Sequence, residues 1–454
     1  MRIALRAVAA ALERELASQA IVTGWSTDSR TVQPGDLFFA LRGPHHDGHN
    51  YAAGAAANGA VGIVADRDVE AGCPVLRVEE TCAALQRLAA RARRQWGGKI
   101  VAVTGSAGKT TTKDIVADLL AAEMRTERSE GNLNNEIGLP LSLLRMDEAA
   151  QACVVELGMN HPGEIRRLAE IARPDVGVVT NVGYAHIENF DSIEGIAAAK
   201  RELIESLPDE GAAVLNADDP RVAAMRNAHK GPTILFGQSP GADVRAEDVE
   251  LAGDRVRFRV GTAKFDSSLT GRHNLSNVLA GIAVARIYGI APERLRDRVR
   301  TLAPGKMRGQ RLDVRGMTIF NDCYNSNPEA ARAMLDVLKD TPARRRIAVL
   351  GEMLELGHWA EPLHRGVGDY AVACGVDVLV GICGAACHML DAAKKKGLRA
   401  SAAFFFDDSS LAGRLVRALA QPGDAILFKG SRGVHVERAL AEFLYSADAP
   451  EGHG

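Results

Sequence analysis

The sequence contains no apolar run of the roughly 20 residues that a membrane-spanning helix requires. Its N-terminus is interrupted by charges at Arg6, Glu13, Arg14 and Glu15, so it lacks the continuous apolar segment of a secretory signal. The seven cysteines are scattered and form no Cys-x-x-Cys pair, which favours a reducing compartment. We therefore expect a cytoplasmic protein with no membrane insertion.

The chain also lacks an excess of either charge. Its 55 basic and 57 acidic side chains give a formal charge of -2, which argues against nucleic acid as a partner. A hydrophobic content of 46% with 25% charged residues is ordinary for a globular protein. A length of 454 residues corresponds to about three domains. We expect the protein to act as a monomer.

The pattern of apolar segments predicts an α/β protein of three domains. The first, residues 1–97, begins with an amphipathic helix over residues 1–18. The second, residues 98–308, alternates apolar strands with helices and adds an antiparallel meander within 241–270, which predicts a parallel sheet covered on both faces. The third, residues 309–454, alternates again and predicts a Rossmann-like domain, although no Gly-x-Gly-x-x-Gly follows its strands. The expected central elements are strands 100–104, 152–157, 176–181 and 212–216, and helices 109–124, 162–172 and 192–207.

A glycine-rich turn follows the first central strand, but one glycine of the usual phosphate-loop spacing is missing. Val103 stands where the first glycine of G-x-x-x-x-G-K-[ST] is expected. An ordinary strand-to-helix turn is the alternative explanation. As a phosphate loop, the backbone N–H groups would cradle phosphates, Lys109 would reach them, and Thr110 would bind Mg²⁺. The predicted cradle consists of Gly105, Ser106, Ala107, Gly108, Lys109, Thr110 and Thr111.

Three residues beyond this loop are candidates for metal binding. Glu156 ends an apolar strand, where a second ligand for Mg²⁺ is expected. The alternative is that Glu156 is an ordinary surface glutamate at a strand end. His186 follows the next strand and has an equal claim to a purely structural role. Lys200 lies on the apolar side of its helix, where burial would lower its pKa and allow carbamate formation with CO2.

Several polar clusters are expected near the same sheet edge. The loop 131–138 places three asparagines and a glutamate between glycines. Asn274 and Asn277 begin a predicted helix, where one would serve as an N-cap and the other could bind an adenine edge. Segments 322–328 and 427–432 collect polar residues at strand ends, where caps and turns are the alternative.

Taken together, these motifs resemble the Mur ligase superfamily, whose phosphate loop has the shortened glycine spacing seen at 104–112. Further similar blocks lie at 26–30, 34–43, 47–49, 131–138, 156–158, 273–277, 324–328, 353–357 and 429–432. Within the superfamily, the chain is similar to ligases that join D-alanyl-D-alanine to UDP-N-acetylmuramoyl-tripeptide, using ATP, in peptidoglycan synthesis. The rivals are a ligase of the MurE type, folylpolyglutamate synthase and, from a different class, a nucleotide-switched binding protein.

The resemblance implies a role for each matching residue. Lys109 and the loop would hold ATP, Thr110 and Glu156 one Mg²⁺, and His186 with a carbamylated Lys200 a second. The remaining implied ATP contacts are Asn274, Asn277, Arg311 and Asp322. The implied contacts to the UDP-sugar peptide and the dipeptide are Thr27, Asp28, Ser29, Arg30, Asp47, His49, Asn134, Asn135, Asn325, Asn327, Lys429 and Arg432.

Overall fold

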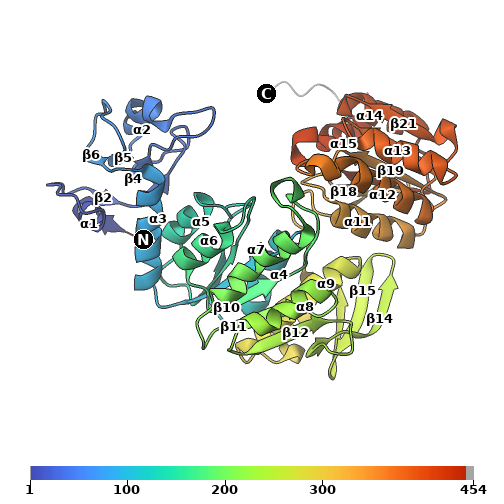
Figure 1. Cartoon of the computed structure of the whole chain (residues 1–454), viewed down its shortest axis with the longest axis horizontal. Coiled ribbons are helices and arrows are strands. Elements are labelled where there is room, and N and C mark those ends of the chain that lie inside the picture. Colours follow the sequence, from blue (N-terminus) through green and yellow to red (C-terminus); the bar gives the residue numbers. More distant parts are fainter. Residues whose placement is uncertain (1, 446–454) are drawn as a thin grey trace.

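The computed structural model describes residues 2–445 and consists of three sheet-containing units that follow one another along the chain (Figure 1). The N-terminal and C-terminal units lie at opposite ends of the molecule, with the central unit between them. Within the described range, no helix combines the length and apolarity needed to cross a bilayer. The α/β class expected from the alternating pattern is confirmed by this arrangement.

The N-terminal unit is built on a parallel sheet with strand order β3-β4-β5-β6. The amphipathic helix expected over residues 1–18 is much shorter, because strand β1 occupies its first residues and Glu13 adopts a left-handed φ of 59° just after it ends. The elements are β1 (Ile3–Ala4), α1 (Leu5–Ala11), β2 (Ile21–Val22), β3 (Gly24–Ser26), β4 (Asp36–Phe39), α2 (Ala52–Ala57), β5 (Gly62–Ala65), β6 (Val75–Arg77) and α3 (Thr81–Gln95).

The central unit contains a seven-stranded sheet in which every pairing is parallel, with order β13-β12-β11-β10-β7-β9-β8. Its strands are β7 (Lys99–Thr104), β8 (Thr126–Arg128), β9 (Ala152–Glu156), β10 (Val176–Val179), β11 (Ala212–Asn216), β12 (Thr233–Gly237) and β13 (Val244–Arg245). Its helices are α4 (Lys109–Leu120), α5 (Gly138–Arg145), α6 (Glu164–Ala172), α7 (Ile193–Glu205), α8 (Pro220–Ala224), α9 (Arg272–Ile287) and α10 (Arg296–Thr301).

Both faces of this sheet are buried, which explains why its strands are apolar throughout. Side chains alternate between the faces of a strand. Along β7, Ile100 and Ala102 pack into the core that includes α5, α6 and α7, whereas Val101 and Val103 pack into the core that includes α4 and α9. Val103 is therefore a fully buried strand residue, and the phosphate loop begins only after it.

The expected antiparallel meander is present in the central unit. It consists of β14 (Glu247–Ala252), β15 (Arg255–Val260) and β16 (Ala263–Ser267).

The C-terminal unit has a mixed sheet of order β17-β18-β22-β19-β20-β21, in which only β17 is antiparallel. The C-terminal elements are β17 (Gln310–Val314), β18 (Met317–Asp322), α11 (Pro328–Asp340), β19 (Arg345–Gly351), α12 (Ala360–Ala373), β20 (Val378–Ile382), α13 (Ala386–Lys395), β21 (Ala403–Phe406), α14 (Ser409–Leu419), β22 (Asp424–Lys429) and α15 (Val436–Leu444).

One lysine is buried on α7. Lys200 is only 2% exposed, between turns of helix that carry Ile196 and Leu203 into the core. Its amine makes no hydrogen bond or ion pair with any residue that the structure describes. Burial, and secondly the charge of Lys109, holds the pKa of Lys200 well below its usual value. An unpaired charge at this position costs folding free energy, so Lys200 requires a functional explanation.

We predict that Lys200→Met stabilises the protein in buffer free of CO2, magnesium and nucleotide. The folded pKa lies below the unfolded value of 10.5, so the unfolded state binds more protons and the parent gains stability as pH rises toward 10.5. The variant should have a higher free energy of unfolding than the parent at pH 7, and this difference should shrink as pH rises. Denaturant unfolding from pH 7 to 9.5 measures both. Lys99→Met, at a 53% exposed side chain, is the control; an equal change in both variants would contradict the prediction.

Candidate active site

The glycine-rich turn at 105–108 joins β7 to α4 and places a helix N-terminus at the carboxyl edge of the central sheet. Two of its positions require glycine. A Cβ at Gly105, where φ is 152°, would overlap the Thr180 hydroxyl, and one at Gly108, where φ is 80°, would lie 2.7 Å from Asn277 Oδ1. Backbone N–H groups at such a helix start form an anion-binding site. The turn is thus shaped as a phosphate cradle.

Asn181, at the end of the neighbouring strand β10, fixes the shape of this turn. Its side chain accepts a hydrogen bond from the Ala107 N–H at 2.8 Å and donates to the Ala107 carbonyl at 3.0 Å. The Ser106 hydroxyl donates to the Gly183 carbonyl at 3.0 Å, and the Gly183 N–H donates back to it at 2.8 Å. The cradle is therefore held by its neighbouring loop.

Glu156 connects the phosphate loop to the asparagine-rich loop. It lies at the end of β9 and is 2% exposed. One carboxylate oxygen accepts from the Thr110 hydroxyl at 2.6 Å, and the other accepts from the Asn134 amide at 2.8 Å. A buried carboxylate beside a threonine hydroxyl at a phosphate loop is an oxygen donor pair suited to Mg²⁺, which usually completes its shell with water and phosphate oxygens.

Two lysines lie near each other at the phosphate loop. The Lys109 amine donates to the Gly105 carbonyl at 2.9 Å, and burial lowers its pKa, opposed by the nearby Glu156 charge. Lys200 lies close enough for the charge of Lys109 to contribute to its lowered pKa. The Lys109 amine at the cradle would favour a bound anion.

His186 emerges after β10 and meets a residue from the C-terminal unit. Its Nδ1 lies 2.6 Å from Glu355 Oε2, although the contact does not have hydrogen-bond geometry. The close approach of the His186 ring is the main reason that the pKa of Glu355 lies below its usual value. The loop carrying Glu355 also packs Trp359 against Tyr184, with ring centroids 6.3 Å apart. The two units thus contact each other at the predicted metal-binding histidine.

Asn274 and Asn277 lie beside the phosphate loop, but neither caps the helix. The N-cap of α9 is Gly271, with φ 88°, so the N-cap hypothesis was wrong. Instead, Asn277 accepts from the Thr112 hydroxyl at 3.1 Å and donates to Asn274 at 3.3 Å. Both asparagines face the same cavity as the phosphate loop.

The C-terminal unit contributes directly to the phosphate loop. Asn327 donates to the Ser106 carbonyl at 3.1 Å, and Arg308, at the junction with the central unit, donates to the Thr110 hydroxyl at 3.0 Å. The Arg308 guanidinium stacks on Tyr324, with its central carbon 3.9 Å from the ring centroid. Deeper in this unit, the buried Lys429 amine binds Asp322 at 2.6 Å.

These groups surround one cavity of about 700 Å³ between the central and C-terminal units. It brings together most of the predicted nucleotide, metal and dipeptide residues: Ser106, Ala107, Gly108, Lys109, Thr110, Thr111, Asn134, Asn135, Glu156, His186, Asn274, Asn277, Asp322, Asn325, Asn327 and Lys429. Gly105 and Lys200 are buried and are not among the residues that line the cavity. Arg311 instead pairs with Asp313 along its own strand, and Arg432 is 56% exposed near Glu437.

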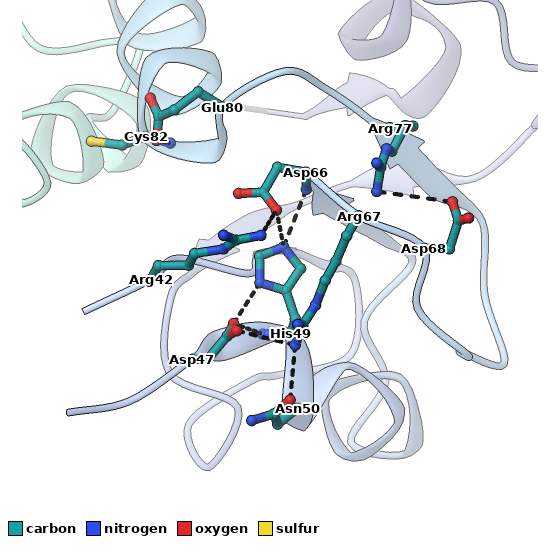
Figure 2. Close-up of polar contacts among 10 residues, drawn as sticks. All are labelled: Arg42, Asp47, His49, Asn50, Asp66, Arg67, Asp68, Arg77, Glu80 and Cys82. Atoms are coloured by element: carbon teal, nitrogen blue, oxygen red, sulfur yellow. Dashed lines mark hydrogen bonds and ion pairs between the residues drawn. The ribbon is translucent and has the colours of Figure 1, made fainter. Parts of the chain in front are cut away.

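The predicted UDP-sugar contacts lie in the N-terminal unit, away from this cavity. Asp28 and Arg30 form an exposed ion pair at 2.6 Å, and Thr27 and Ser29 lie in the same turn. The His49 ring is enclosed, as Figure 2 shows: Nδ1 lies 2.6 Å from Asp47, and Nε2 accepts from the Asp66 N–H at 3.1 Å. His49 therefore fixes Asp47, while Arg42 and Arg67 present the more exposed charges.

Sequence reasoning missed Arg308, Asn181 and Glu355. Asn181 lies two residues after the apolar strand β10, near the sheet edge where Glu156 ends β9, so its position was a usable signal. Arg308 and Glu355 carry none, because their roles depend on how two units pack. Among residues 2–445 there is no cluster of three His, Cys, Asp or Glu side chains arranged to hold a metal. Any Mg²⁺ here would therefore draw further ligands from a nucleotide, water or a carbamate.

Comparisons with known proteins agree with this geometry. Three family models match: "Mur ligase family, catalytic domain" at 21–93, "Mur ligase middle domain" at 103–285 and "Mur ligase, glutamate ligase domain" at 307–432. The chain is 33% identical to the UDP-N-acetylmuramoyl-tripeptide–D-alanyl-D-alanine ligase of Bacillus subtilis, covering 94% of each protein.

Two solved structures are also similar. A crystal structure of MurF from Acinetobacter baumannii has a TM-score of 0.90 and 29% identity, covering 97% of this chain and 98% of that one. MurF ligase from Thermotoga maritima in complex with ADP has a TM-score of 0.82 and 30% identity, covering 92% of this chain and 96% of that one. The phosphate-loop cavity and these full-length similarities lead to one conclusion: the chain belongs to the Mur ligase family.

Proposed function

We propose that this protein is an ATP-dependent ligase that joins D-alanyl-D-alanine to UDP-N-acetylmuramoyl-tripeptide in peptidoglycan precursor synthesis. The observation that carries the proposal is the single cavity in which a phosphate loop, a buried carboxylate and polar groups of the C-terminal unit face one another. The name of the Bacillus subtilis relative supplies the substrate pair. The cytoplasmic location and monomeric state expected from the sequence form part of the same proposal.

In this proposal, ATP binds with its phosphates in the 105–111 turn and its adenine toward Asn274 and Asn277. Thr110 and Glu156 would hold one Mg²⁺, and His186 with a carbamylated Lys200 a second. The bound ions would neutralise charge on the transferring phosphoryl group. The residues fit this assignment, because Glu156 is a buried oxygen donor and the Lys200 amine has a lowered pKa and no protein partner.

The chemistry follows from the substrate. A carboxylate is a poor electrophile, so its oxygen attacks the γ-phosphorus of ATP, giving ADP and an acyl phosphate. The dipeptide amine then attacks the acyl carbon, and the tetrahedral intermediate collapses to an amide and phosphate. Lys109, whose amine already lies at the cradle, would stabilise the negative charge on the γ-phosphoryl oxygens during transfer.

We assign one substrate to each domain. Residues 1–97 would bind the UDP-sugar peptide through Thr27–Arg30 and the Asp47–His49 turn, and residues 98–308 would bind ATP. Residues 309–454 would receive the dipeptide near Asn325, Asn327, Lys429 and Arg432, with Asp322 and Arg311 on the nucleotide side. Domain closure would assemble the site and exclude water.

Phosphate release tests the choice of substrates. With ATP, magnesium and UDP-N-acetylmuramoyl-tripeptide, we predict that D-alanyl-D-alanine stimulates release, because its amine completes the reaction. Single amino acids should not stimulate release with this acceptor. Stimulation by meso-diaminopimelate or L-lysine on the corresponding dipeptide acceptor, without stimulation by D-alanyl-D-alanine, would instead identify a MurE-type ligase. Release independent of every acceptor would favour a nucleotide-switched protein.

Lys200→Ala tests the carbamate. The variant should lose at least about a hundredfold in kcat, since it removes a proposed metal ligand. Short carboxylates such as acetate or formate should restore part of the activity, because they can occupy the space and supply oxygen donors. Lys99→Ala, which removes an exposed lysine, should show neither effect. Unchanged activity of Lys200→Ala would reject a role in metal binding.

A further inference from the structure

A second buried lysine lies on the phosphate-loop helix, and the mechanism above does not use it. Lys113 is in the second turn of α4, four residues after Lys109, and is only 1% exposed. Its amine points away from the cavity lining and donates to two backbone carbonyls, Ser129 at 2.6 Å and Gly131 at 3.2 Å. Asp114 lies 3.5 Å away.

This arrangement compensates for the cost of burying an ammonium group. An ammonium has three donors, and hydrogen bonds to a charged donor are stronger than neutral ones. The two carbonyls belong to the chain just after β8, beyond the residues that pair with β9 in the sheet. Replacing Lys113 by an apolar residue would leave both carbonyls without this donor. Lys113 therefore fixes the start of the asparagine-rich loop to α4.

The segment held in this way, residues 129–135, carries the site's polar groups. Asn132, Asn134 and Asn135 line the cavity, and Asn134 donates to Glu156. Glu156 in turn accepts from Thr110, in the first turn of the same helix α4. The contacts thus form a closed ring from α4 through Lys113, the 129–135 segment, Asn134 and Glu156 back to α4.

The opposite end of the loop is held by the N-terminal unit. Gln86 on α3, which is 6% exposed, donates to the Glu136 carbonyl at 2.9 Å. The loop therefore lies between the helix that starts at the phosphate cradle and the helix that leads from the unit proposed to bind the UDP-sugar peptide. An acceptor peptide extending from one unit to the other would pass this loop.

We infer that Lys113 is a positioning residue for the acceptor substrate: it sets the 129–135 segment against the phosphate loop so that the acceptor carboxylate meets the γ-phosphate. The inference rests on the proposed function. It assigns Lys113 an effect on acceptor binding that is separate from nucleotide binding, although the residue lies on the phosphate-loop helix.

The test compares Lys113→Met with the parent in the phosphate-release assay. The KM for UDP-N-acetylmuramoyl-tripeptide should rise about tenfold or more, while the KM for ATP should change less than about threefold, because small misplacements at a site have large effects. Lys113→Arg keeps the charge and several donors, so it should raise the KM for UDP-N-acetylmuramoyl-tripeptide less than Lys113→Met does. Lys99→Met, the exposed control, should match the parent.

Two further readouts separate positioning from general destabilisation. Hydrogen exchange should accelerate at residues 129–135 in Lys113→Met, without acceleration in the C-terminal sheet. In an Asn134→Ala background, Lys113→Met should raise the acceptor KM by a smaller factor than in the parent, because both act through one segment. If Lys113→Met does not fold, Lys113→Gln takes its place in every arm.

An unchanged acceptor KM, an equal rise in the ATP KM, or unchanged exchange at 129–135 would overturn the inference. These results differ from failure of the proposed function. In that case, the parent enzyme itself would show no phosphate release that depends on acceptor and dipeptide.

Discussion

The arrangement of the site depends on the buried carboxylate of Glu156. It is the only group described here that bonds both to the phosphate loop, through Thr110, and to the asparagine-rich loop, through Asn134. A carboxylate at 2% exposure is costly unless its oxygens are satisfied. The Thr110 hydroxyl and the Asn134 amide satisfy these oxygens and are held in place by them. A bound Mg²⁺ would therefore meet the Glu156 carboxylate and the Thr110 hydroxyl already oriented toward each other.

Basic side chains lie around the phosphate loop. Lys109 lies at the cradle with Lys200 nearby, and Arg308 donates to the Thr110 hydroxyl. Burial lowers the pKa of both lysines, which means that the folded protein carries these groups at a cost. A bound polyphosphate would favour the charged form of Lys109 and offset part of that cost.

The contact between His186 and Glu355 joins the central and C-terminal units. Packing of Trp359 on Tyr184 supports it. Glu329 approaches the Tyr184 N–H at 3.2 Å, and burial raises the pKa of this carboxylate. These contacts hold the C-terminal unit against the loop that follows β10.

Much of this could be predicted from sequence, because parallel strands end at one edge of a sheet. That rule brought the phosphate loop, Glu156 and His186 together, and the antiparallel alternation predicted the meander. The prediction that an asparagine caps α9 was wrong, since a glycine with positive φ occupies the N-cap position. Helix α1 is also shorter than its apolar pattern indicated. Arg308, Glu355 and Lys113 could not be predicted, because their partners are distant in sequence and depend on packing between units or loops.

The central claim is that this cavity transfers a phosphoryl group from ATP to the acceptor carboxylate. The most direct measurement uses UDP-N-acetylmuramoyl-tripeptide with ¹⁸O in the carboxylate that becomes the amide. If an acyl phosphate forms, one labelled oxygen remains with phosphorus when the amine displaces it, and mass spectrometry will find ¹⁸O in the released phosphate. Unlabelled phosphate, with amide product formed at the same rate, would contradict the account.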